Sequence, residues 1–138
     1  MTDADLVAKK LAQVETYVAE LRRLARPELM AEDLRERRFV EHTLQIAIQA
    51  ALDVASHIVS DERLGEPRTN QALFDLLAAA GWVPHETALA MRRAVGFRNV
   101  VVHGYASVDV DLVRDVVEHH LQDLLDFVVA IRARLSSP

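Results

Sequence analysis

Residues 110–135 decide the fold class and have the sequence VDLVRDVVEHHLQDLLDFVVAIRARL. Apolar residues return in this stretch at intervals of three or four, the repeat of one face of an α-helix: Val110, Val113, Val117, Leu121, Leu124, Val128, Ile131 and Leu135. Acids at its start and arginines at its end suit the helix dipole. Further apolar residues beside this stripe predict one long final helix that buries two faces, one in its own bundle and one against a second copy of the chain.

The same apolar repeat occurs twice more, over residues 7–25 and 40–58. Pro27 lies between these two stripes and should end the first helix or begin the next, because proline has no amide hydrogen to donate. The mostly charged residues 28–38 that follow are interpreted as a solvated connection. Three amphipathic helices within 138 residues therefore predict an all-α fold.

Shorter helices fit between the second and the last stripe. Asn70 can cap one that ends before Gly81, where a left-handed backbone conformation is expected. Pro84 suits the first turn of another. We therefore expect a single domain over residues 1–138, an antiparallel bundle of about five helices that assembles as a homodimer.

Composition excludes several classes of protein. The chain is 51% hydrophobic with a formal net charge of −5, which is too apolar for intrinsic disorder. It has no cysteine, so a disulfide framework and a thiol nucleophile are excluded. No apolar run approaches the roughly 20 residues of a membrane-spanning helix, and residues 1–5 carry two acids where a signal peptide is positive. We expect a cytoplasmic protein with no membrane partner.

Residues 96–105 interrupt the helical pattern with the sequence GFRNVVVHGY. Three consecutive β-branched valines between two glycines are poor helix formers. A short strand is one interpretation. A distorted helix end is favoured, because the rest of the chain is helical.

Residues 87–108 contain no Asp or Glu, although the whole chain contains 21. The same window holds Arg92, Arg93, Arg98 and His103. An acidic protein could hold an anion here, because the electrostatic field in a cleft depends on the nearby groups. Ordinary surface arginines are the plainer explanation, and composition alone favours it.

Arg98 and His103 have side chains that could act together on a phosphodiester. Arg98 stays charged and can contact two phosphate oxygens at once, and His103 can transfer a proton near neutral pH. Side chains five residues apart point roughly 140° apart on an ideal helix, so these two converge only if the helix is distorted or if two protomers contribute. Asn99 is four residues from His103 and could orient its imidazole. By itself the Arg-x4-His pattern is weak, and a capping histidine with a surface arginine is commoner.

Residues 98–105 resemble the Arg-Asn-x3-His-x-Tyr signature of the HepT toxins, a branch of the HEPN superfamily of ribonucleases. The preceding residues 91–97, the loop with Pro67 and the long final helix occur where such proteins place them. The similarity extends over about residues 38–134.

The resemblance implies an all-α dimer whose two motifs face a shared cleft. It implies metal-independent endoribonuclease activity without a cofactor, with Arg98 and His103 catalytic and Asn99 in support. In type VII-like toxin–antitoxin systems such proteins are paired with a small MntA-like nucleotidyltransferase that transfers AMP to the motif tyrosine, here Tyr105. A phosphate added beside Arg98 would occupy the anion site and repel RNA. Arg92 and Arg93 are further candidates to line the cleft.

Basic residues are sparse outside residues 87–108, and lysine is limited to Lys9 and Lys10. A broad RNA-binding surface is therefore not expected. Recognition would depend on the cleft and a structured substrate such as tRNA, or on surface supplied by the antitoxin.

Asp53, His57 and Asp61 share another helix face, where they could bind a divalent cation or line the cleft. A solvated helix face is commoner, and Asp53 orienting a catalytic group is favoured over metal binding. Two other functions stay open: a non-catalytic companion subunit that binds nucleotide or the nucleotidyltransferase, and a helical dimer that serves only as an interaction module.

Overall fold

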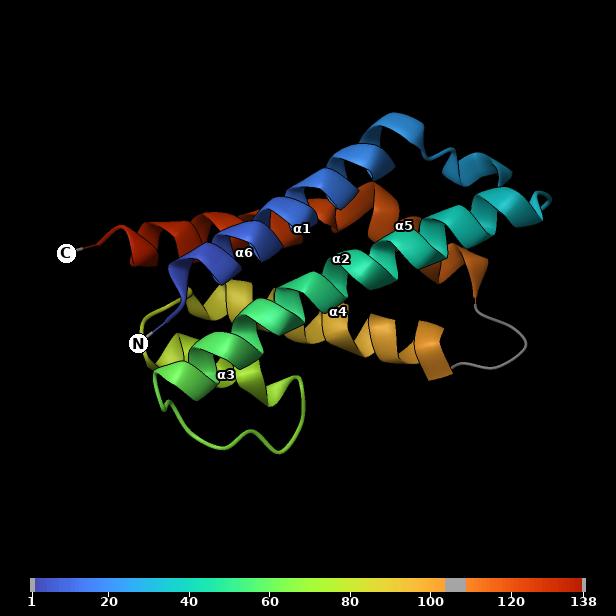
Figure 1. Cartoon of the computed structure of the whole chain (residues 1–138). Helices are drawn as coiled ribbons and strands as arrows, with labels where there is room; N and C mark the ends of the chain where they lie inside the picture. The colour runs from blue at the N-terminus through green and yellow to red at the C-terminus, as the bar shows by residue number, and fades with distance from the viewer. Residues whose placement is uncertain (1, 104–108, 138) are drawn as a thin grey trace.

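The computed structural model describes residues 2–103 and 109–137, which form six α-helices and one short 3₁₀ helix (Figure 1). In chain order these are α1 (Ala4–Leu24), η1 (Pro27–Leu29), α2 (Leu34–Asp61), α3 (Ala72–Ala79), α4 (His85–His103), α5 (Val110–His119) and α6 (Leu121–Leu135). The described part of the chain contains no strand, which confirms the predicted all-α fold. Among the helices described, none combines the length and the apolar character needed to cross a membrane. The homodimer stays a prediction.

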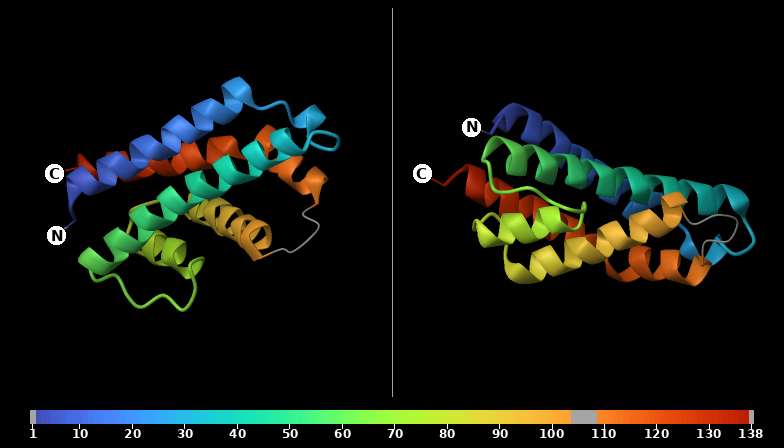
Figure 2. Two further views of the ribbon diagram at one scale, coloured as in Figure 1. Left: turned by 45° about the vertical axis from the view of Figure 1, so that its right-hand side comes forward. Right: turned by 90° about the horizontal axis from the view of Figure 1, so that it is seen from below.

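Helix α2 is the centre of the bundle and contacts each of the other described helices. Helices α1 and α6 lie on one side of it, and α3 and α4 lie on the other (Figures 1 and 2). The chain runs antiparallel from α1 to α2 and from α2 to α4 (Figure 1). Both chain ends lie at the end of the bundle opposite to the C-terminal end of α4 (Figures 1 and 2).

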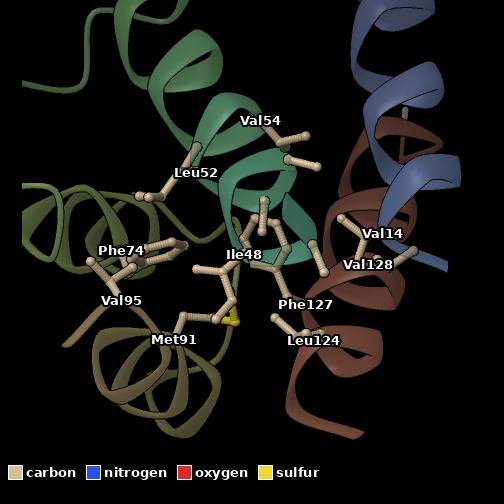
Figure 3. Packing of buried hydrophobic residues seen from close by; sticks show 14 of the residues in the cluster. Val14, Ile48, Leu52, Val54, Phe74, Met91, Val95, Leu124, Phe127 and Val128 are labelled. Atoms are coloured by element: carbon tan, nitrogen blue, oxygen red, sulfur yellow. The ribbon is translucent and has the colours of Figure 1, made fainter. Parts of the chain in front are cut away.

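The apolar stripes predicted for α1 and α2 form the core. All six stripe positions of α2 are buried: Val40, Leu44, Ala47, Ala51, Val54 and Ile58. Phe127 of α6 reaches in between α2 and α4, where its ring meets that of Phe74 from α3 edge-on, with centroids 5.7 Å apart (Figure 3). This burial, rather than intrinsic helix propensity, is the main source of helix stability in such a bundle.

Aspartates begin three of the helices. Asp3, Asp33 and Asp109 each accept backbone hydrogen bonds at the N-terminus of α1, α2 or α5. The prediction that Asn70 caps α3 is wrong, because the Thr69 hydroxyl accepts from the amide of Ala72 at 3.1 Å instead.

The single long final helix predicted from the apolar stripe is also wrong. The chain turns at His120, between α5 and α6, and the His120 imidazole lies 3.3 Å from an Asp115 oxygen and 3.2 Å from an Asp123 oxygen. The stripe does not reveal the turn, because the step from Val117 to Leu121 keeps the helical interval of four.

No strand forms over residues 96–103, which continue α4 as α-helix to His103. The low helix propensity of valine is a weak preference, and α4 continues here although Val100 is exposed and Val101 is only partly buried against the core. Gly96 lies close to Gln71, whose side-chain amide donates to the carbonyl of Arg92 at 3.0 Å. Residues 104 and 105 of the same segment lie outside the described residues.

Candidate functional site

Helix α4 carries Arg98 and Asn99, both half-buried, and ends at His103. The side chain of His103 and the whole of Tyr105 lie outside the described residues. The sequence predicts that Arg98 and His103 converge only through a distorted helix or through two protomers, and both alternatives stay predictions.

Arg98 is held by α2 and, through α2, by α1. Its Nη2 donates to Oε1 of Gln49, and Nε2 of Gln49 donates to Oδ1 of Asp53 at 2.8 Å. Nζ of Lys10 lies 3.1 Å from the other oxygen of Asp53. These four side chains from three helices form one continuous series of polar contacts, which we call the Arg98 relay.

The Arg98 relay does not use all the donors of the arginine. Nε of Arg98 is buried and has no hydrogen-bond partner among the described residues. Such a buried donor without a partner in the described part of the chain is uncommon in proteins.

The structure separates Asp53 from His57 and Asp61, the other two residues considered for a metal site. Asp53 contacts Gln49 and Lys10, whereas His57 lies 3.1 Å from Asp61 and accepts from the amide of Asp3 at 3.2 Å. No cluster of three potential metal ligands occurs in the part of the chain that is described. Gln49 lies between Asp53 and Arg98 and contacts both, and the role of Asp53 in orienting a catalytic group stays a prediction.

Arg92 and Arg93 do not join Arg98. Arg92 pairs with Asp75 of α3, and Arg93 is exposed beside a cavity of about 180 Å³ that helices α5 and α6 help to line. The three arginines of α4 therefore face different neighbours: Arg98 faces α2, Arg92 faces α3, and Arg93 faces the cavity beside α5 and α6.

Residues 87–108 contain no Asp or Glu, but acidic side chains from other helices lie next to this segment in the structure. Asp75 pairs with Arg92, and Asp115 and Asp123 line the same cavity as Arg93. The structure thus brings Arg98 together with Asp53, but it forms no shared basic cleft from all three arginines within one chain. Sequence reasoning missed Gln49, although its spacing of four from Asp53 on α2 was the available signal.

Comparison with known proteins agrees with the family resemblance and with the fold. A family model described as ribonuclease HepT-like matches residues 10–131. The mRNA nuclease HepT of Shewanella oneidensis is 28% identical over 130 residues, covering 94% of this chain and 98% of that protein. The tRNA nuclease HepT of Aphanizomenon flos-aquae is 32% identical over 95 residues, covering 69% and 65%.

Solved structures show the same likeness in three dimensions. A tri-AMPylated Shewanella oneidensis HEPN toxin in complex with an MNT antitoxin matches with a TM-score of 0.86 at 28% identity, covering 96% of this chain and 99% of that one. The cytosolic protein YutE of Bacillus subtilis matches with a TM-score of 0.87 at 17% identity, which shows a shared fold alone. Because the family model spans most of the sequence, and toxins of this kind share its fold, the chain belongs to the ribonuclease HepT-like family of HEPN proteins.

Proposed function

We propose that this protein is a metal-independent endoribonuclease, the toxin of a type VII-like toxin–antitoxin pair, with Arg98 and His103 as its catalytic residues. The observation that carries the proposal is the Arg98–Tyr105 motif within a chain that matches the HepT-like family over residues 10–131. The names of the relatives support cleavage of RNA, with one called an mRNA nuclease and another a tRNA nuclease.

The chemistry needs no metal, because RNA carries its own nucleophile. The 2′-oxygen attacks the neighbouring phosphorus, the bond to the 5′-oxygen breaks, and the products are a 2′,3′-cyclic phosphate and a 5′-hydroxyl. His103 takes the proton of the 2′-hydroxyl or protonates the leaving oxygen, and two copies in a homodimer provide one group for each task. Arg98 stabilises the negative charge that develops on the phosphoryl oxygens. Asn99 supports the pair.

Cleavage of total RNA and of tRNA in EDTA tests this assignment. We expect wild-type protein to cut RNA in EDTA, His103→Ala to be slower by about 10²–10⁴-fold, and Arg98→Ala by about 10²–10³-fold. His119→Ala and Arg114→Ala are matched controls, because both residues are exposed on α5 and lie outside the motif. Equal rates for all five proteins would refute the catalytic assignment.

Regulation by a partner follows from the same motif. We propose that an MntA-like nucleotidyltransferase transfers AMP to Tyr105, as the relative described as tri-AMPylated and bound to an MNT antitoxin suggests. The added phosphate would place negative charge near Arg98 and exclude RNA. The mass of the co-expressed protein should rise by one or more AMP units, and Tyr105→Phe should remove the increase. Mass increments without any cleavage by the unmodified protein would favour the non-catalytic companion subunit.

A further inference from the structure

We propose that Gln49 and Asp53 are positioning residues that hold the Arg98 guanidinium through a neutral amide and so leave its positive charge available to RNA phosphate. The inference rests on the proposed ribonuclease function, because it assigns Arg98 a phosphate to bind. It concerns residues of α2, outside the motif on α4.

The hydrogen-bonding groups fix the orientation of the Gln49 amide. The guanidinium of Arg98 can only donate, and the ionised carboxylate of Asp53 can only accept. The amide oxygen of Gln49 therefore faces Arg98, and its NH₂ group faces Asp53 at 2.8 Å. The opposite orientation would place donor against donor and acceptor against acceptor. Asp53 thus determines which end of Gln49 meets Arg98.

The amide also keeps the negative charge of Asp53 one side chain away from Arg98. A carboxylate in direct contact with a guanidinium neutralises it and occupies the donors that would otherwise grip phosphate. Arg92 shows this other arrangement on the same helix, since it pairs directly with Asp75. Lys10 approaches Asp53 from α1 at 3.1 Å and balances its charge.

Arg98 is consequently fixed in place without being neutralised. Gln49 engages Nη2, while the buried Nε has no partner among the described residues. A guanidinium that is anchored at one nitrogen, yet retains unused donors, suits a group that must meet a transition state without first reorganising.

The double variant Q49E/D53N tests the proposal, because it moves the negative charge without changing the polar contacts. The carboxylate introduced at position 49 would accept from Arg98 and from the NH₂ group of the amide introduced at position 53, whose oxygen would accept from Lys10. Net charge and side-chain size are kept, so thermal stability should stay near that of wild type. We expect kcat for RNA cleavage to fall about 10–100-fold with a smaller change in KM, because Arg98 acts on charge that develops during reaction.

A purely structural role for these residues predicts a different result. Q49E/D53N would then cleave RNA at the wild-type kcat, and this outcome would overturn the proposal. Gln49→Ala provides an independent arm if the double variant does not fold. It removes the anchor and adds no charge, so we expect kcat to fall about tenfold, and an unchanged kcat would count equally against positioning.

Arg98→Ala separates failure of this inference from failure of the proposed function. If Arg98→Ala cleaves RNA as well as wild type does, the catalytic role of Arg98 is wrong. If Arg98→Ala is impaired while Q49E/D53N and Gln49→Ala are not, the ribonuclease proposal stands and the positioning role of α2 is refuted.

Discussion

Arg132 donates two hydrogen bonds to the carboxylate of Glu15, at 2.8 and 2.6 Å, and so joins α6 to α1. Because these bonds favour the charged carboxylate, they lower the pKa of Glu15 from its ordinary value of 4.5. A carboxyl group whose pKa is lower in the folded than in the unfolded protein stabilises the fold above the unfolded pKa. That contribution is lost as the pH falls through the folded pKa.

Replacing Arg132 with methionine should therefore lower stability at neutral pH, and the difference should shrink as the pH falls through the lowered pKa of Glu15 in the folded protein. The expected difference at neutral pH is about 0.5 kcal/mol, because both partners are partly exposed to solvent. Urea unfolding of wild type and Arg132→Met across this pH range measures the effect. A difference of the same size at acidic pH would mean that Arg132 acts through packing instead.

Residue spacing predicts which side chains share a helix face but not what they meet across it. The spacing on α2 identifies Asp53 as a candidate, together with His57 and Asp61. Its contact with Lys10 depends on how α1 pairs with α2, and its link to Arg98 depends on the approach of α4. Neither can be derived from the spacing within α2 alone.

At the scale of the helix, α4 tolerates a glycine that it does not need for its backbone conformation. An alanine methyl group at Gly96 would stand 3.4 Å from Nε2 of Gln71, an ordinary contact distance. Glycine inside a helix costs about 0.5–1 kcal/mol relative to alanine. We expect Gly96→Ala to raise stability by about this amount in thermal or urea unfolding.

Gly81→Ala is the matched control for this prediction. Gly81 has a φ of +80°, a left-handed conformation that alanine adopts with strain. We expect this variant to be destabilised by about 1–2 kcal/mol. A loss of stability in Gly96→Ala as well would show that the close approach of Gln71 to α4 requires glycine.

Helices were predictable where a stripe is buried and less so where a helix ends. The stripes of α1 and α2 predict those helices because every stripe residue of α2 lies in the core. The turn at His120 was missed because the apolar interval continues across it. The three valines of α4 were a poor guide, because helix propensity is a weak preference and α4 continues through Val100 even though this side chain is exposed.

At the scale of the molecule, the acidic balance and the dispersed arginines limit how many phosphates of the proposed RNA substrate the chain could contact. The formal net charge is −5, and Arg92 is already paired with Asp75. Few phosphates can be neutralised at once, and each contributes about one unit to the dependence of log K on log salt. For a non-cleavable 2′-deoxy analogue of the RNA, we expect a plot of the logarithm of the association constant against the logarithm of the salt concentration to have a slope of about −2. The association constant is obtained from Kd measured at increasing salt concentration. A slope near about −6 or steeper would indicate a broad phosphate-binding surface that the described residues do not present.

Both chain ends lie at the end of the bundle opposite to the C-terminal end of α4 (Figure 1). A tag or an immobilising anchor at either terminus would therefore sit a full bundle length from the last turn of the helix that carries the motif. The molecule can be tethered to a sensor surface with the C-terminal end of α4 directed into solution. The proposed binding of RNA and of a nucleotidyltransferase can then be tested on the same immobilised protein, with the attachment far from that end.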